Sequence, residues 1–250
     1  MTFWVLAGIG LFCALLSLLF EETLPSAERY EGNVLGSVKQ LGTVARNKGF
    51  SSFLGIVGLY NLPFMAYIAV GSYVYITFFG LTELEYSGYF AFAALVTAAG
   101  PFIWLIASRF TTARRFTTIV LSVSLATVVA MLLVGESSPV LFCATFLVFA
   151  LAEACVRPYS TNILLSQQEG DTGAAASLIN FTHTAIGSIG MLAAVLPWSS
   201  FVAGIGWLIA GSMGVALLGW FALLRSNIPL QGVKEKPVPT LDSEAELVIE

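Results

Sequence analysis

Two oppositely charged side chains, Glu153 and Arg157, lie one helical turn apart in the stretch "LAEACVRPYS", residues 151–160. The stretch belongs to a long apolar run, and a charged group inside a bilayer costs roughly 2.5 to 3.5 kcal/mol to insert. The four-residue spacing puts both side chains on one helical face, where they neutralise each other or share a water-filled cavity. Two interpretations follow: binding of substrate or protons, above all by Glu153, or a plain ion pair whose arginine extends to the inner interface.

Polar residues also gather in the apolar run over residues 174–196. Asn180, His183 and Thr184 fall within about one turn and share a face with Ser177 and Gly187. A lone histidine among apolar residues is either a hydrogen-bonded packing residue or a group that binds a ligand or a proton. Asn180 and His183 are therefore further candidates for binding substrate or protons.

The apolar run over residues 53–79 holds one asparagine and four tyrosines: Tyr60, Asn61, Tyr67, Tyr73 and Tyr75. Tyrosines near the ends of a membrane span usually anchor it in the interface. We therefore expect only Asn61 and Tyr67 to line a cavity.

No arrangement of residues points to catalysis. The chain has one histidine, no pair of carboxylates within an apolar run, and neither an HExxH nor a GxSxG motif. Cys13, Cys143 and Cys155 lie in apolar runs without CxxC spacing, so neither a disulfide framework nor a zinc site is indicated. The net charge of −4 does not favour nucleic-acid binding. We predict no enzyme activity, no metal and no other cofactor.

The elements that carry these residues are membrane helices. Of 250 residues, 57% are hydrophobic and 10% are charged, against about a quarter charged in soluble domains. At about 20 residues per crossing, seven apolar runs are long enough to span a bilayer: residues 2–20, 53–79, 89–107, 116–134, 140–165, 174–196 and 201–224. The sequence predicts an all-α membrane protein with seven transmembrane helices.

The predicted division of the chain has four parts. A first transmembrane helix occupies residues 1–20, a cytoplasmic linker residues 21–52, and a six-helix bundle residues 53–225. Periodic apolar residues in the linker indicate an amphipathic helix in the interface, although an ordinary solvated linker is the alternative. The tail, residues 226–250, is rich in acids and contains prolines, which predicts disorder.

Basic residues predict the orientation, because Lys and Arg are retained on the cytoplasmic side. Ten of the eleven fall in alternate connections or in the tail: Arg29, Lys39, Arg46, Lys48, Arg109, Arg114, Arg115, Arg225, Lys234 and Lys236. The remaining one is Arg157. This pattern predicts a cell-membrane protein with its N-terminus outside and its C-terminus in the cytoplasm.

Small residues and prolines indicate how the helices pack. Gly206, Ala210 and Gly214 form a ridge of small residues on the last span, which lets another helix approach closely. Pro63, Pro101 and Pro158 are expected to break the second, third and fifth spans, because proline removes a helical hydrogen bond. Broken helices often line cavities in transporters, but packing kinks without function are equally common.

The order of several motifs resembles the major facilitator superfamily. A span ends in "FEETLP", a basic connection follows, and a proline-containing span runs into "AYIAVGSYVYITFFGL". Later comes "RPYSTNILLSQQEGDTGAAASLINFTHTAIGSIG". Together they resemble helices 6 to 12, the C-terminal half, of a Bcr/CflA-like drug:proton antiporter.

The resemblance assigns residues to family motifs one at a time. Gly71, Ser72 and Tyr73 fall on the seventh-helix "SPFVY" segment, where Tyr73 replaces the proline. Pro158 matches the tenth-helix proline, and Tyr159 replaces its asparagine. Gly173 and Ser177, with Ala175 and Ala176, match the start of the eleventh helix.

The resemblance implies a transporter that works by alternating access, with lipid, a small-molecule substrate and protons as partners. It implies proton-coupled efflux of drugs or small metabolites, and it implies that a six-helix N-terminal half is missing. One alternative is an exporter of sugars or amino acids without drug specificity. A second is a seven-helix receptor or sensor, since the predicted topology fits both classes.

Overall fold

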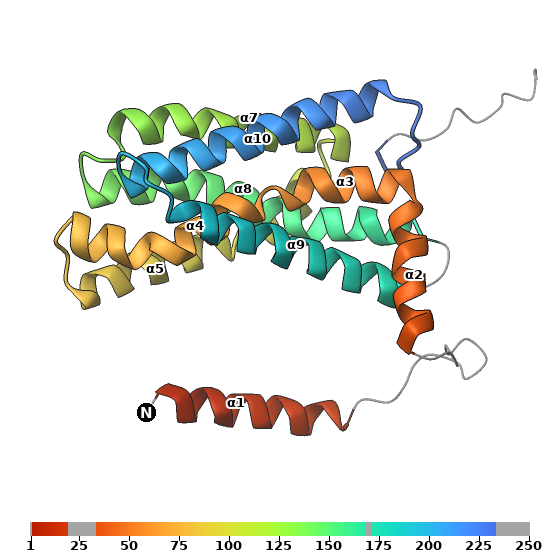
Figure 1. Cartoon of the computed structure of the whole chain (residues 1–250), viewed down its shortest axis with the longest axis horizontal. Coiled ribbons are helices and arrows are strands. Elements are labelled where there is room, and N and C mark those ends of the chain that lie inside the picture. Colours follow the sequence, from red (N-terminus) through yellow and green to blue (C-terminus); the bar gives the residue numbers. More distant parts are fainter. Residues whose placement is uncertain (1, 20–33, 169–171, 234–250) are drawn as a thin grey trace, which may run out of the picture. The chain divides into compact units, whose positions relative to one another are not determined.

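The computed structural model describes residues 2–19, 34–168 and 172–233. Helices joined by turns make up this part of the chain (Figure 1). They are α1 (Thr2–Ser17), α2 (Val34–Arg46), α3 (Lys48–Gly58), α4 (Asn61–Ser72), the π-helical stretch η2 (Tyr73–Phe78), α5 (Glu83–Thr97), α6 (Gly100–Ala107), α7 (Ala113–Val134), α8 (Pro139–Ser166), α9 (Thr172–Ala194) and α10 (Phe201–Arg225). The predicted all-α membrane fold is confirmed.

The chain divides into two compact units, residues 1–37 and residues 38–250. In the first unit, α1 has 16 residues and is about 24 Å long at 1.5 Å per residue. The predicted first span continues to Phe20, which lies outside the described residues. α2 crosses the division where the amphipathic linker helix was expected, and its Val44 is buried in the core of the second unit.

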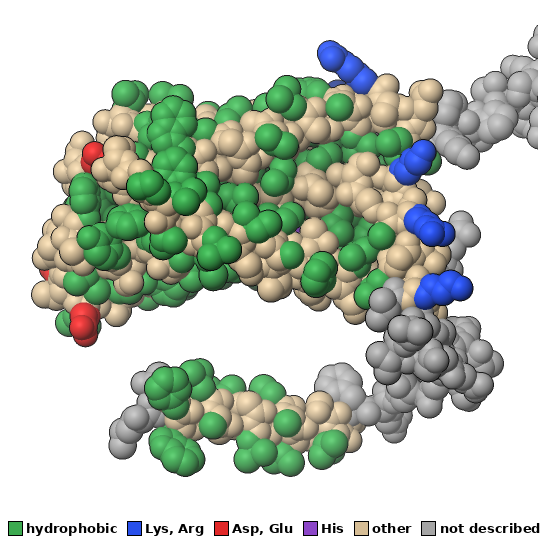
Figure 2. Space-filling model, viewed as in Figure 1, with side chains coloured by type: hydrophobic (Ala, Val, Ile, Leu, Met, Phe, Trp, Pro, Cys, Tyr) green, Lys and Arg blue, Asp and Glu red, His purple; other side chains and the backbone are tan. Residues whose placement is uncertain are grey.

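The second unit is a helical bundle built around α8. This helix packs against α7, α6, α5 and α3, while α9 packs along α4 and α10 lies against α7, α3 and α4 (Figure 1). Its core buries large aromatic side chains, including Trp220, Tyr60 and Tyr159. Apolar side chains cover much of its outer surface (Figure 2), as expected for a protein whose solvent is lipid.

Among the described residues, five helical segments are long and apolar enough to cross a membrane: Lys48–Phe78, Glu83–Ala107, Ala113–Val134, Pro139–Ser166 and Phe201–Arg225. α9 has 23 residues, but Asn180, His183 and the neighbouring threonines make it more polar than these five. The helix α1 is apolar but shorter. The predicted number of seven spans therefore stays a prediction.

The segment formed by α5 and α6 lies at the edge of the bundle. None of the residues of α5 is buried, and α6 buries only Gly100. Its first turn is fixed by a reciprocal cap, in which the Thr82 N–H donates to Glu85 Oε2 at 2.8 Å and the Glu85 N–H donates to Thr82 Oγ1 at 3.3 Å. The start of α5 is therefore set by its cap, and its side chains are not buried in the bundle.

Two of the three predicted proline breaks are present. α3 ends at Gly58 and α4 begins at Asn61, so the chain breaks just before Pro63. α5 ends at Thr97, and α6 begins one residue before Pro101. A proline ring excludes the helical bond to the carbonyl four residues earlier, which is why each break lies on its N-terminal side.

The predicted break at Pro158 is wrong. α8 continues through this proline as one helix of 28 residues. The carbonyl that loses its helical donor belongs to Ala154, and Gly100 of α6 packs against this point: a Cβ atom on Gly100 would lie 2.6 Å from the Ala154 carbonyl carbon. Membrane helices tolerate proline where neighbouring helices support the altered turn.

Glycines bring two helix pairs into close contact. A Cβ on Gly206 of α10 would lie 2.9 Å from Leu132 Cδ2 on α7, whereas one on Gly214 would meet nothing within 4 Å. The predicted ridge on the last span therefore contacts a neighbour at only one of its two glycines. On α9, a Cβ at Gly190 would lie 2.7 Å from the carbonyl carbon of Leu62 on α4, so these two backbones touch.

The turn after α10, residues 226–233, closes one end of the bundle. The side chain of Gln167, just after α8, accepts from the Gln231 N–H at 3.0 Å and donates to the Gln231 carbonyl at 3.2 Å. Asn47, which caps α3, donates to the Gln167 carbonyl at 2.8 Å. Leu230 is buried beneath them. A disordered tail was predicted from residue 226. Residues 226–233 form a turn of which Leu230 is buried, residues 234–250 lie outside the described part, and disorder of the tail stays a prediction.

Candidate functional site

The charged pair on α8 forms an ion pair inside the bundle. Arg157 Nε donates to Glu153 Oε1 at 2.5 Å, one helical turn away. The two side chains differ in burial, because Glu153 is 6% exposed whereas Arg157 is 49% exposed. Burying a charge is costly unless it is paired and hydrogen-bonded, so the arginine is what allows the carboxylate to lie inside the bundle.

The arginine also reaches a second helix. Its Nη2 donates to Asn61 Oδ1 at 2.9 Å, across to the first residue of α4. Asn61 is buried, and its Nδ2 donates to the Gly58 carbonyl at 3.4 Å, a group left free by the break between α3 and α4. A three-residue polar network, Glu153, Arg157 and Asn61, therefore joins α8 to the broken helix. The Arg157 guanidinium reaches across to α4 instead of extending along α8 to the interface.

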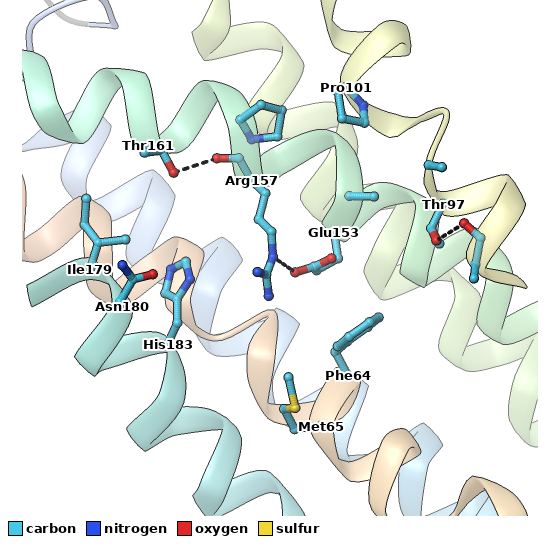
Figure 3. A pocket seen from close by; sticks show the side chains of 14 residues that line it. Phe64, Met65, Thr97, Pro101, Glu153, Arg157, Thr161, Ile179, Asn180 and His183 are labelled. Atoms are coloured by element: carbon cyan, nitrogen blue, oxygen red, sulfur yellow. Dashed lines mark hydrogen bonds and ion pairs between the residues drawn. The ribbon is translucent and has the colours of Figure 1, made fainter. Parts of the chain in front are cut away.

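Glu153 and Arg157 of this network line a cavity of about 790 Å³ between α4, α5, α6, α8 and α9 (Figure 3). The polar side chains in its lining are Thr97, Glu153, Arg157, Thr161, Asn180 and His183. The apolar ones are Phe64, Met65, Ala94, Ala98, Pro101, Ala154, Pro158 and Ile179. The volume falls within the range of sites for small molecules, roughly 300 to 1,000 Å³.

α9 contributes further polar side chains to the lining of the cavity. Asn180 and His183 both line the cavity, whereas Ser177 and Thr184 are exposed and are not among its lining residues. The Nε2 atom of His183 is buried without a hydrogen-bond partner among the described residues. The structure thus brings four of the six binding candidates to the cavity, and Asn61 joins them through Arg157. Their roles in binding substrate or protons stay predictions.

Tyr67 lies elsewhere. Its ring stacks on Phe146 at a centroid distance of 3.8 Å and tilts against Phe142 at 5.9 Å. The side chain is buried between α4 and α8 and is not in the lining of this cavity. Its surroundings are those of a packing aromatic residue.

The family-motif positions are spread along the bundle. Gly71 is buried under the Tyr67 ring, Ser72 is exposed, and the exposed Tyr73 ring meets Phe201 edge-on at 4.9 Å. Gly173 and Ser177 are exposed near the start of α9. Pro158 alone lines the cavity.

Two buried tyrosines were not selected from the sequence. Tyr60 shares a 3.1 Å hydrogen bond with Ser124 and stacks on Phe149, and Tyr75 packs on Tyr89 at 5.1 Å. Both were expected to anchor a span end in the interface. The span begins at Lys48, so Tyr60 lies about 18 Å along it. Residues 48–52 are Lys-Gly-Phe-Ser-Ser, so no run of apolar residues marks this start in the sequence.

Comparison with known proteins decides the family. The model of the family described as Major Facilitator Superfamily matches residues 1–191. The chain belongs to the major facilitator superfamily. This membership and the five apolar helices identify a multi-pass membrane protein of a transporter family.

A more specific relative is a Bacillus subtilis (strain 168) protein named "Uncharacterized MFS-type transporter YdgK". It is 30% identical over 102 residues, which make up 40% of this chain. The match spans only 25% of the relative's length. No solved structure matches the chain.

Proposed function

We propose that this superfamily member is a transporter that moves drugs or small metabolites out of the cell by alternating access, coupled to protons. The observation that carries the proposal is the network of Glu153, Arg157 and Asn61, in which Glu153 and Arg157 line the 790 Å³ cavity. Ionisable groups within membrane spans are costly and mark substrate or proton pathways. Membership of the family favours a transporter over the seven-helix receptor that the topology also allows.

The bundle serves as one half of the transport path, and a six-helix N-terminal half supplies the other. Two features support this. The segment of α5 and α6 has a single buried residue, Gly100, and Asn180 and Phe181 of α9 are exposed. A second bundle covering these helices would enclose the substrate between two halves.

The proposed orientation puts the N-terminus outside and the C-terminus in the cytoplasm of the cell membrane. On the face drawn in Figure 2, basic side chains gather toward the end of the bundle where α2 lies, and acidic ones at the opposite end. This charge distribution is the one that retains an end in the cytoplasm. Reporter fusions at residues 1, 136 and 198 active only outside, with fusions at 111 and 250 active only inside, are the expected result. Any other pattern contradicts the orientation.

Proton flux tests the transport activity. The chain is coexpressed with the N-terminal helices that complete the twelve, and everted vesicles are loaded with a pH-sensitive dye. Adding each member of a panel of amphipathic drugs, sugars and amino acids then reports which compounds move protons. At least one amphipathic compound should do so in the wild type and fail with Glu153→Gln, while Arg225→Gln at the exposed end of α10 transports normally. Proton movement with sugars or amino acids alone would support the exporter without drug specificity, and none with any compound would refute the proposal.

A further inference from the structure

We propose that the cavity binds amphipathic organic anions, small molecules with a carboxylate or similar acidic group on an apolar body, and that Arg157 holds the acidic group. The inference rests on the proposed function, because it names the substrate class of the same cavity. It depends on the free donors of Arg157, on the way charge is distributed over the wall, and on the apolar character of the rest of the lining.

Arg157 has N–H groups that donate to no other described residue. A guanidinium carries five N–H groups in a planar fork that matches a carboxylate. Two of them are used, by Glu153 through Nε and by Asn61 through Nη2. Those on Nη1 have no partner among the described residues, and the side chain is half exposed where it lines the cavity. The arginine is thus held by two neighbours and still presents N–H groups to a ligand.

The charge that a ligand meets is positive. Glu153 and Arg157 are the charged side chains in the lining, but the carboxylate is 6% exposed and the guanidinium 49% exposed. Figure 3 shows the arginine extending from α8 into the space between α4 and α9, with Glu153 at its side. A cation would approach the arginine first and be repelled, whereas an anion would be attracted and hydrogen-bonded.

The remaining wall suits an apolar body. Phe64 and Met65 of α4, Pro101 of α6 and Ile179 of α9 line the cavity together with Ala94 and Ala98. Burying apolar surface against such side chains contributes roughly 25 cal/mol per Å². The His183 Nε2 atom is buried away from solvent, so charge recognition falls to Arg157.

Glu153 then acts as a competitor for the ligand. Its carboxylate already occupies one edge of the guanidinium, and it repels a second carboxylate placed nearby. Replacing it with glutamine keeps the shape and removes the charge, so an anion should bind more tightly. An ion pair with only a structural role predicts no such gain.

Binding of two size-matched probes tests the inference. The chain is placed in nanodiscs of neutral phosphatidylcholine, and 1-naphthaleneacetate and 1-naphthylmethylammonium are measured by equilibrium dialysis against empty nanodiscs. All the lining residues of the described cavity belong to this chain, so binding is measured on the chain by itself. The anion should bind at least tenfold more tightly than the cation, a difference of about 1.4 kcal/mol. Glu153→Gln should strengthen anion binding at least tenfold, Arg157→Gln should weaken it at least tenfold, and Arg225→Gln should leave it unchanged.

Glu153→Gln guards against a folding artefact, since it leaves no unpaired acid in the core, whereas Arg157→Gln leaves one. Arg157→Lys keeps the charge without the fork and should weaken anion binding less than glutamine does. Equal binding of the two probes, a preference for the cation, no binding of the anion, or no gain with Glu153→Gln would each overturn the inference. Anion binding without transport by the completed protein would refute the proposed function alone, and transport of cations only would refute the inference alone.

Discussion

The close approach of α9 to α4 predicts how the cavity responds to a single methyl group. Gly190 of α9 lies against the backbone of Leu62 on α4, and α4 and α9 form two walls of the cavity. A Cβ atom at this glycine would lie 2.7 Å from the Leu62 carbonyl carbon, whereas carbon atoms in ordinary contact are about 3.5 to 4.0 Å apart. The Leu62 carbonyl oxygen lies closer still, so Gly190→Ala forces the two backbones apart.

The expected cost follows from what obstructs the new methyl group. Overpacking costs about 1 to 3 kcal/mol, and the upper end applies because backbone atoms, unlike a flexible side chain, have little freedom to move aside. The alanine itself favours a helix by about 0.5 to 1 kcal/mol relative to glycine, so Gly190→Ala should destabilise the protein by about 2 kcal/mol. Gly214→Ala makes the same chemical change where a Cβ meets nothing within 4 Å, and it should be neutral or slightly stabilising.

Unfolding of the purified chain in mixed micelles by increasing SDS, followed by circular dichroism, measures both variants. Gly190→Ala should unfold at a lower SDS fraction than the wild type, and Gly214→Ala at the same or a higher one. Coincident transitions for the two variants would refute the close approach of α4 and α9, since both variants make the same glycine-to-alanine change within a helix.

Three further substitutions test other contacts by the same unfolding measurement. Gly100→Ala should destabilise by about 1 to 3 kcal/mol, because its Cβ would lie 2.6 Å from the backbone of α8; wild-type stability would contradict this packing. Asn61→Leu removes an acceptor of the Arg157 guanidinium and should lower the free energy of unfolding by about 1.5 to 3 kcal/mol. In a protein that already carries Arg157→Gln, the same substitution should lower it by much less. Tyr60→Phe removes the 3.1 Å hydrogen bond to Ser124 and should cost about 1 kcal/mol, whereas no loss in Tyr60→Phe would mean that the hydroxyl is satisfied elsewhere.

Contacts in the site between residues that are close in sequence could be predicted from the sequence. The spacing of Glu153 and Arg157 places them on one face of any helix, so their ion pair follows from helical geometry alone. The apolar runs likewise predicted the helices, since a bilayer demands that backbone groups be satisfied within each span. Both predictions depend on local periodicity.

The cross-helix contacts could not be predicted in this way. Asn61 contacts Arg157 because α3 ends at Gly58. Pro63 disturbs the helical turn that precedes it, so the helix is interrupted several residues before the proline. Pro158 leaves α8 intact, since whether a proline ends a helix depends on the neighbour packed against the altered turn. A proline in the sequence shows where a helix lacks a backbone hydrogen bond. The packing of neighbouring helices determines whether the helix ends there.

The turn after α10 has a consequence for the timing of assembly. Gln231 joins Gln167 and, through it, Asn47, so these contacts at the α3 end of the bundle form only once all the helices from α3 to α10 have been synthesised. At about 5 to 20 residues per second, Asn47 leaves the ribosome roughly 10 to 40 s before Gln231. During that interval the polar ends of α3 and α8 lack their last partner, which makes this the window in which a chaperone or a protease would find the nascent protein most accessible.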